Sequence, residues 1–233
     1  HDPLRRQRQM CIRDRVFGNS DGFVRLFDGA EPFHGTNPIS VAVPSGQGNP
    51  WLLDMATSSV PFNRVELHQS LQRDLPRGVA SDSDGGDTTD PFCAEMLAPL
   101  GGSDFGFKGA ALGGVAEIFS AVLTGMKLSP DIAPMAGPDF LRAREMGAFV
   151  IVMDPEAFVA APLVEAGMTR YLALLRGSKP RAGQSVMAPG DREWARAAHR
   201  QVKGIPLDPI TVTNFSQLAE DYKVRLPWHT GPS

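Results

Sequence analysis

"PLGGSDFGFKGAALGGVAEIFSAVLTG", residues 99–125, is the stretch that decides the fold. A glycine-rich turn runs into a segment whose apolar residues recur at spacings of three and four, which predicts a helix with one buried apolar face. The small residues from Gly109 to Gly114 allow another backbone or a ligand to approach closely. Gly125 is placed to end the helix. The predicted buried face consists of Leu112, Val115, Phe119, Val122 and Leu123.

The beginning of this stretch has the properties of an anion site. Main-chain N–H groups, the partial positive charge of a helix N-terminus and the side chain of Lys108 would together attract phosphate or pyrophosphate. The spacing is close to that of a P-loop, but Phe107 separates Gly106 from Lys108 and no serine or threonine follows to hold magnesium. No GxGxxG motif follows a strand, which argues against a Rossmann site. A tight turn with a solvated lysine is the alternative.

Two strands are predicted upstream, at Ile39–Val43 and Trp51–Met55, because both runs are apolar and a cluster of turn residues separates them. Gly147–Met153 is continuously apolar, which predicts a buried strand. Since helices and adjacent strands are interleaved, the expected class is α/β with a mixed, largely antiparallel sheet and flanking helices. Helices are expected at Val60–Arg73, Leu163–Leu175, Asp191–Val202 and Phe215–Val224, the last with Asn214 as its cap.

Two stretches are expected to form loops. Residues 75–91 are rich in glycine and aspartate, and the pair Asp90 and Pro91 at their end predicts a short helix through Leu97. The four aspartates of "DSDGGDTTDP" lack the terminal glutamate of a calcium loop, so no metal site is predicted there. Residues 126–146 read as a long surface loop, and loops of this length tend to be functional or mobile.

The composition is that of a soluble globular protein, with 233 residues, 42% of them hydrophobic and 21% charged. No run of about 18 apolar residues indicates a membrane span. Residues 1–15 look like the translation of a sequencing-library adapter, and we expect them to be a scar rather than a natural basic arm. Without them the chain holds 18 basic and 24 acidic groups, a net charge of −6 that is unusual for a nucleic-acid binder. Cys93 is then the single cysteine, expected to be buried in a reducing compartment.

Two polar residues are candidates for chemistry. Asp54 in "LLDMATSS" stands at the carboxyl end of a predicted strand, where it could accept ribose hydroxyls or orient a base. The alternative is that Asp54 caps the next turn, with Thr57 and Ser58 making local hydrogen bonds. His34 in "HGTNP" is a weak candidate for a catalytic proton carrier, and a structural role is the alternative.

Five segments, taken together, resemble a known family. In order and spacing, "GTNPISVAV", "LLDMATSS", "DGGDTTDP", "PLGG" and "FKGAALGGVAEIFSAVLTG" are similar to the malate/L-lactate dehydrogenase family of non-Rossmann oxidoreductases. That family includes sulfolactate and ureidoglycolate dehydrogenases and reductases of cyclic imino acids. The resemblance covers about Gly18 to Asp191. It implies hydride transfer between NAD or NADP and a small 2-hydroxy or 2-oxo acid, in a cytoplasmic homodimer.

The resemblance also implies which residues bind the cofactor. Ser20 matches a position near the nicotinamide, Lys108 matches the lysine of the family's "HKGYG" segment, and "APGD" at 188–191 matches a turn beside the cofactor. Phe107 stands where histidine is usual, and Ala110 and Ala111 replace tyrosine and glycine. The full set implied for the cofactor is Ser20, Asp54, Met55, Ala56, Lys108, Gly190 and Asp191.

The same resemblance implies how the chain is organised. Residues 16–233 match the C-terminal two-thirds of such an enzyme, with a cofactor-binding core at about 16–155 and a helical part at about 156–233. The family's proton-exchanging histidine and the groups that hold the acid lie in its first third, so we expect no turnover from this chain. A non-catalytic nucleotide- or anion-binding module and, less well supported, a phosphoryl-transfer enzyme are the alternatives. No nucleic acid or membrane is expected as a partner.

Overall fold

The computed structural model describes residues 13–45, 48–226 and 228, and the chain divides into two compact units at residue 192. Residues 1–12, most of the expected scar, lie outside the described part. Residues 13–15 form the first half of a strand, and their backbone pairs with two neighbouring strands.

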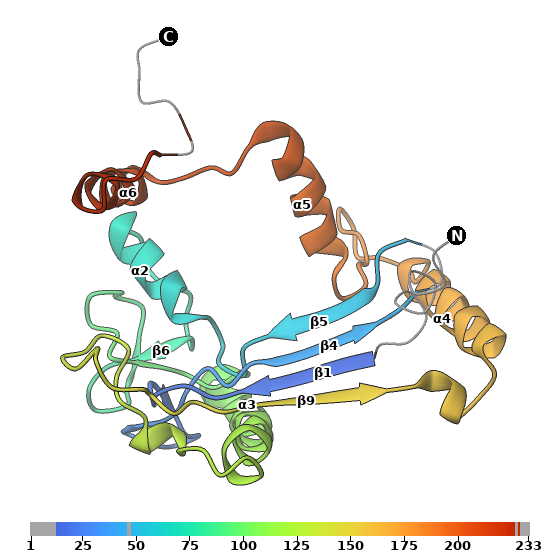
Figure 1. Cartoon of the computed structure of the whole chain (residues 1–233), viewed down its shortest axis with the longest axis horizontal. Helices are drawn as coiled ribbons and strands as arrows, with labels where there is room; N and C mark the ends of the chain where they lie inside the picture. Colours follow the sequence, from blue (N-terminus) through green and yellow to red (C-terminus); the bar gives the residue numbers. More distant parts are fainter. Residues whose placement is uncertain (1–12, 46–47, 227, 229–233) are drawn as a thin grey trace. The chain divides into compact units, whose positions relative to one another are not determined.

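The first unit contains a four-stranded antiparallel sheet in the order β5-β4-β1-β9 (Figure 1). The predicted pair of adjacent strands is confirmed, with Ser40 opposite Asp54 and Val43 opposite Trp51. The strands are β1 (Arg13–Gly18), β4 (Ile39–Val43), β5 (Trp51–Met55) and β9 (Ala148–Met153).

The continuous apolar run Gly147–Met153 predicted a buried strand. Strand β9 forms there, but it is not buried on both faces. It lies at the edge of the sheet, and Val150 and Val152 are 57% and 61% exposed. Its other face is half-buried, and the ring of Phe149 packs edge-on against Phe119 at 5.2 Å. The prediction was wrong because it assumed a covering layer on each side of the strand, and the described residues cover one side.

A second sheet of short strands has the order β3-β2-β8-β6-β7, with β2 and β8 parallel. It confirms a mixed α/β fold. The core packs Val24, Leu75, Ala80 and Leu97 against Val65 of helix α2 (Phe62–Ser70). The strands are β2 (Val24–Arg25), β3 (Pro32–His34), β6 (Ala80–Ser81), β7 (Asp87–Thr88) and β8 (Met96–Leu97).

The region 75–97 differs from the prediction in two ways. The expected loop contains β6 and β7, and the expected helix through Leu97 is absent from this described segment. The Asp90 carboxylate does accept a bond from the Phe92 N–H at 2.9 Å, but it closes a turn, and Leu97 pairs with Ala80 in the sheet. Cys93, predicted to be buried, is exposed on this turn.

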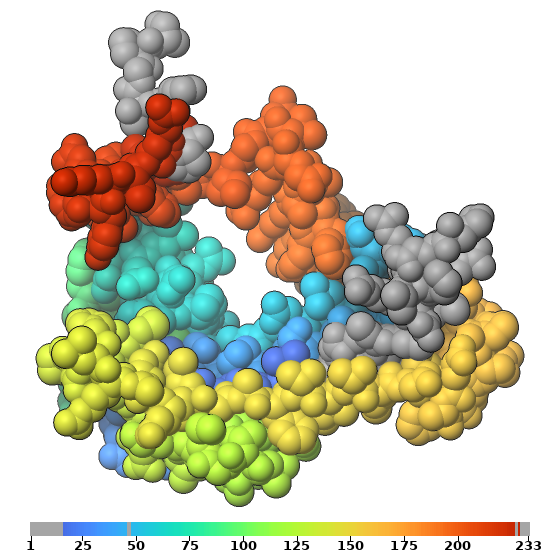
Figure 2. Space-filling view, viewed as in Figure 1, coloured from blue at the N-terminus to red at the C-terminus, as the bar shows by residue number. Residues whose placement is uncertain are grey.

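Helix α3 (Gly102–Glu117) continues as a π-helical turn, Ile118–Val122, and ends near Gly125 with φ +70°. Its buried face is not the predicted apolar one. The predicted residues Leu112, Val115, Val122 and Leu123 are 39–60% exposed, and Figure 2 shows α3, coloured green, at the surface. The residues that face inward are Gly106, Gly109, Gly113, Ala116, Glu117, Ser120 and Ala121.

Close backbone packing explains this reversal. A Cβ atom on Gly109 would lie 2.2 Å from the backbone N of Leu100, and one on Gly113 would lie 3.1 Å from His34 Nδ1. The helix must therefore turn its small residues toward the chain and its branched residues outward. The segment Gly102–Val122 is long and apolar enough to cross a membrane by length and composition alone, and 39% of its most apolar 18-residue window is buried within the protein.

The remaining helices follow the predictions except at one end. Helix α2 confirms the helix predicted at Val60–Arg73. The helices predicted at Leu163–Leu175 and Asp191–Val202 are confirmed by α4 (Ala161–Arg176) and α5 (Asp191–Lys203). The last helix, α6 (Pro209–Asp221), begins earlier than expected, because the Asp208 carboxylate accepts the Thr211 N–H at 3.1 Å and caps it. Asn214 therefore lies inside the helix. Short 3₁₀ turns at Ser129–Asp131 and Pro155–Ala157 complete the elements, and 126–146 is otherwise a loop as predicted.

Candidate functional site

Four of the motifs meet at Thr57. Its N–H donates to Thr36 O at 2.8 Å, and its hydroxyl reaches Thr36 O at 3.1 Å and Asn37 O at 3.2 Å. The Leu100 N–H donates to Thr57 O at 2.8 Å, and the Gly109 N–H donates to Leu100 O at 3.1 Å. These bonds link "HGTNP", "DMATSS", "PLGG" and α3. Thr57 thus makes long-range bonds instead of the local ones that the sequence suggested as an alternative.

His34 lies against this junction. His34 is only 7% exposed. Its ring centroid lies 5.0 Å from that of Phe33, and Gly113 of α3 is close to its Nδ1. Burial lowers the pKa of His34 below its ordinary value of 6.5, and the negative charge of Glu117 raises it in part. The imidazole is therefore neutral at pH 7 and able to accept a proton.

Sequence reasoning did not single out Glu117, which is 6% exposed and lies on the inner face of α3. Its carboxylate accepts bonds from Asn37 Nδ2 at 2.7 Å, Ser129 Oγ at 2.6 Å, the Ser129 N–H at 2.5 Å and Asn19 Nδ2 at 3.4 Å. The signal that could have found it is a single charged residue in the otherwise small and apolar run "GGVAEIFSAV", because a buried charge needs donors around it.

The loop that holds Ser20 is fastened on both sides. Asn19 donates to Lys127 O at 2.8 Å and accepts the Gly147 N–H at 2.8 Å. Asp21 forms an ion pair with Arg144. Between them, Ser20 Oγ is buried and has no hydrogen-bond partner among the described residues.

Ser20 also touches the turn that follows His34. A Cβ atom on Gly35 would lie 2.2 Å from Ser20 Oγ and 2.9 Å from Asn37 Oδ1. The absence of a side chain at Gly35 therefore allows the two loops to touch. The structure brings Ser20, His34 and the Thr57 junction into one neighbourhood.

Asp54 lies on β5, three residues before Thr57. Its side chain is exposed, and its carboxylate forms no ion pair or hydrogen bond with the described residues. The alternative that it caps the next turn finds no support there, because the bonds in that turn come from Ser58 Oγ to Val60 O at 2.7 Å and from Ser59 Oγ to Pro99 O at 2.8 Å. Met55 and Ala56, both half-buried, connect Asp54 to the junction.

The "APGD" turn lies beside the same strand. Pro189 O accepts the Leu52 N–H at 3.2 Å, and Gly190 has a left-handed φ of +95°. Asp191 forms a two-bond pair with Arg176, at 2.7 Å and 2.9 Å, and also accepts the Ala188 N–H at 2.9 Å. The guanidinium holds the pKa of Asp191 below its ordinary value, with the backbone bond adding to the effect. Both oxygens of Asp191 are thus engaged in holding the turn.

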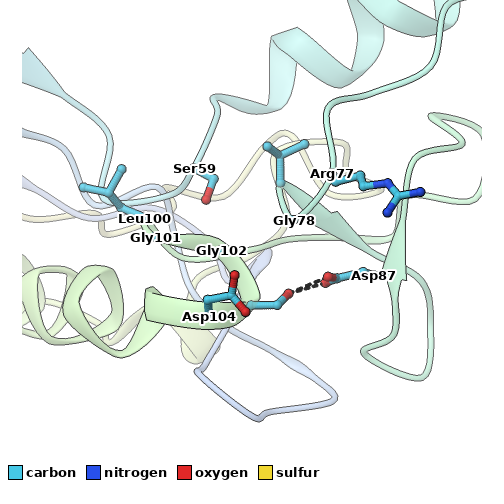
Figure 3. Close-up of a pocket in the computed structure, with 10 residues that line it drawn as sticks. Ser59, Arg77, Gly78, Asp87, Leu100, Gly101, Gly102 and Asp104 are labelled. Atoms are coloured by element: carbon cyan, nitrogen blue, oxygen red, sulfur yellow. Dashed lines mark hydrogen bonds between the residues drawn. The ribbon is translucent and has the colours of Figure 1, made fainter.

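The start of α3, where the sequence suggested an anion site, carries side chains of both charges. A pocket of about 370 Å³ lies there, lined by Arg77, Asp87 and Asp104 among others (Figure 3). Ser103 Oγ donates to both oxygens of Asp87, at 2.5 Å and 2.6 Å, and Arg25 pairs with Asp87 at 3.4 Å. The positive end of the helix therefore already has carboxylates beside it.

Lys108 does not lie in a turn. It is exposed in the second turn of α3, with Nζ 5.3 Å from the ring centroid of Phe105 and 5.7 Å from that of Phe107. The glycine-rich turn is limited to Gly101 and Gly102, whose φ angles are +105° and +62°. The pocket at the start of α3 is lined by neither Lys108 nor Asp54.

Comparison with known proteins identifies the fold and the motifs. A family model described as malate/L-lactate dehydrogenase matches residues 14–216. The chain belongs to this family. It is 30% identical to a Delta(1)-pyrroline-2-carboxylate reductase of Agrobacterium fabrum over 82% of its own length and 54% of the reductase. It is 27% identical to a malate/(S)-sulfolactate dehydrogenase of Methanothermus fervidus, over 94% of this chain and 63% of that protein.

Solved structures of the family agree with this assignment. A malate dehydrogenase from Entamoeba histolytica superposes with a TM-score of 0.82 at 26% identity, covering 94% of this chain and 63% of that one. The chain therefore spans between half and two-thirds of the length of these three relatives.

Clusters of metal-ligating side chains are absent from the described residues. No group of three or more histidine, cysteine, aspartate or glutamate side chains among them could hold an ion. In the aspartate-rich loop, Asp82 Oδ1 accepts the N–H groups of Asp84 at 3.1 Å and Gly86 at 2.9 Å, which is turn chemistry.

Proposed function

We propose that this member of the malate/L-lactate dehydrogenase family functions as an NAD(P)-dependent oxidoreductase that interconverts a small 2-hydroxy acid and its 2-oxo acid. The observation that carries the proposal is the meeting of the family's motifs at Thr57, beside a buried and neutral His34. The names of the relatives, which include malate, sulfolactate and pyrroline-2-carboxylate, support a small carboxylic acid as the substrate class.

The residues present fit a dinucleotide. Ser20 Oγ is a buried hydroxyl whose hydrogen-bonding capacity the described residues leave unused, and Asp54 offers an exposed carboxylate to ribose hydroxyls. When bound, NAD or NADP supplies the nicotinamide that takes or gives the hydride. The residues that would hold it are Ser20, Asp54, Met55, Ala56, Lys108 and the turn at Gly190 and Asp191.

His34 is the candidate for moving the proton. Removal of a hydride from a carbinol carbon requires a base near the hydroxyl, and a neutral imidazole serves this purpose at pH 7. Burial keeps His34 in that form. The expectation that this chain alone gives no turnover stays a prediction.

A homodimer is the second part of the proposal. The outer face of α3 is apolar, with Phe105, Ile118 and Val122 58%, 51% and 60% exposed. An apolar face of this kind on a soluble enzyme is typical of a subunit interface. We expect a second copy to cover it, and we expect the enzyme to act in the cytoplasm without a nucleic-acid or membrane partner.

Titration of NADH and of NADPH into the chain tests the proposal, followed through nicotinamide fluorescence without magnesium. We expect saturable binding of at least one of them, weakened by Asp54→Asn and unaffected by the matched control Asp84→Asn. Oxidation assays with malate, lactate, sulfolactate and ureidoglycolate then test turnover. Failure of both dinucleotides to bind would contradict the assignment.

The two alternative functions give different outcomes. A non-catalytic module would bind a dinucleotide without turning over any acid. This would hold even if the chain were joined to the segments of its relatives that it does not match. A phosphoryl-transfer enzyme would require magnesium-dependent ATP binding at the start of α3. No serine or threonine directly follows Lys108 to hold magnesium, which disfavours this last function.

A further inference from the structure

Hydrogen-bond donors surround the buried side chain of Glu117. Its carboxylate accepts two bonds from Ser129, one from Asn37 and one from Asn19. Both of its oxygens are therefore bound by groups that come from other segments of the chain.

The charge is held without a basic side chain. Among the described residues, the ion pairs of Lys and Arg do not include Glu117. Burying a carboxylate is costly unless donors surround it, and here neutral donors do so. His34 is the titratable side chain whose proton affinity responds to this charge.

The donors belong to the segments that form the candidate site. Asn37 is fully buried with a left-handed φ of +37°, and its side chain also donates to Gly113 O at 3.1 Å. Asn19 precedes Ser20, and Ser129 begins the short 3₁₀ turn Ser129–Asp131 near the start of the long loop. Glu117 thus joins α3 to three loops, which also contact one another through bonds such as Asn19 Nδ2 to Lys127 O and the Gly22 N–H to Ser129 O.

We propose that Glu117 is a positioning residue of the oxidoreductase site, whose buried carboxylate fixes the loops of Ser20 and His34 on α3 in the arrangement that receives the nicotinamide end of the dinucleotide. This inference rests on the proposed function. It assigns a role to a residue for which no motif in the sequence implied one.

Glu117→Gln tests the inference while keeping the side-chain shape. The amide can accept at one end, but its NH₂ group must face a donor, either at Ser129 N or at the Asn37 and Ser129 side chains. We expect the Kd of the dinucleotide that binds the wild type to rise about tenfold or more, the equivalent of about 1.4 kcal/mol.

Asp87→Asn is the matched control. Asp87 also accepts two bonds from a serine and contacts an arginine, but it lies at the start of α3 away from the Ser20 loop. We expect this variant to lower the Tm and to leave the Kd within about twofold of the wild-type value. A loss of affinity caused by general destabilisation would appear in both variants.

A second measurement does not depend on the cofactor. The titration of the His34 ring can be followed by NMR and assigned with His34→Gln. Its midpoint is expected to shift to lower pH in Glu117→Gln, because the negative charge that raises the pKa of His34 is removed. Glu117 is the charged group that acts on His34, and the neighbours Phe33, Thr57 and Gly113 are neutral. An unchanged midpoint would show that the charge of Glu117 does not act on His34.

The outcomes separate the two proposals. Wild-type binding together with an unchanged Kd in Glu117→Gln overturns the role of Glu117, wherever the His34 midpoint lies, and leaves the proposed function standing. Binding of neither dinucleotide by the wild type overturns both. If Glu117→Gln does not fold, Ser129→Ala removes one donor and keeps the charge, and a Kd equal to that of the wild type then refutes the inference.

Discussion

The carboxylate of Asp21 pairs with the guanidinium of Arg144, 123 residues further along the chain. Both side chains are largely buried, 14% and 22% exposed. Asp21 also accepts the Met135 N–H at 2.9 Å, and Arg144 donates to Ala133 O at 2.9 Å. This pair therefore fastens the middle of the long loop to the segment that contains Ser20.

Arg144→Gln is expected to release that loop. Phe140 and Leu141 are 75% and 98% exposed, so little apolar packing would hold the loop once the ion pair is lost. We expect faster amide hydrogen exchange across 131–146 and faster chymotryptic cleavage at Phe140, with exchange in β9 unchanged. Arg142→Gln is the control, since Arg142 is 87% exposed and pairs locally with Asp139. Equal rates in the two variants would show that the Asp21 pair does not hold the loop.

Two glycines of α3 are expected to respond in opposite directions to alanine. In Gly109→Ala the new methyl group meets the backbone N of Leu100 at 2.2 Å, and overpacking against backbone should cost about 3 kcal/mol or more. In Gly114→Ala nothing lies within 4 Å, and relief of the helical glycine penalty should add about 0.5–1 kcal/mol. Denaturant unfolding measures both. Similar destabilisation by the two changes would contradict the packing described for α3.

The Asp191–Arg176 pair is expected to make stability depend on pH in the acid range. The pKa of Asp191 is lowered in the folded state, so the stabilisation is present above the unfolded value of about 3.9 and is lost as the pH falls through the folded value. The Tm of the wild type should exceed that of Asp191→Asn at pH 7, and the difference should shrink on going from pH 5 to pH 3. A difference that grows toward low pH would reverse the sign and reject the pairing as its source.

Charge on the outer face of α3 is expected to prevent self-association. If a second copy covers Ile118 and Val122, Ile118→Glu should convert a dimer to a monomer in light scattering coupled to size exclusion. Val202→Glu is the control, because Val202 is 80% exposed on α5. A wild-type monomer, or a dimer that tolerates the charge at residue 118, would exclude this face as the interface.

The sequence predicted those elements whose causes are local. The pair Ile39–Val43 and Trp51–Met55 was predicted with its observed bounds, because a turn cluster separates two short apolar runs. The orientation of α3 was not predicted. It depends on the close packing of Leu100 and His34 against glycines of that helix. Glu117, the main polar residue of the site, was not predicted because its role also depends on contacts with distant segments. The partners of Glu117 come from 12 to 98 residues away, and spacing along the chain carries no sign of them.

The site residues divide in the same way. The position of Asp54 on a strand could be predicted because the strand is local, and its exposure leaves it available. Lys108 was expected beside the glycine-rich turn at the helix start, but the helix begins six residues earlier and incorporates that lysine. Asp87, at the start of that helix, is brought there by a pairing of strands that no local pattern reveals.

The junction at Thr57 has a consequence for how the protein folds. It joins segments near residues 36, 57 and 100, and Glu117 adds a segment from residue 19. Contacts of such long sequence separation carry a loop-closure cost and form only after the overall chain topology is in place. A partially folded intermediate would therefore lack the binding site altogether, and a dinucleotide would act as a ligand of the native state alone, slowing unfolding without speeding collapse.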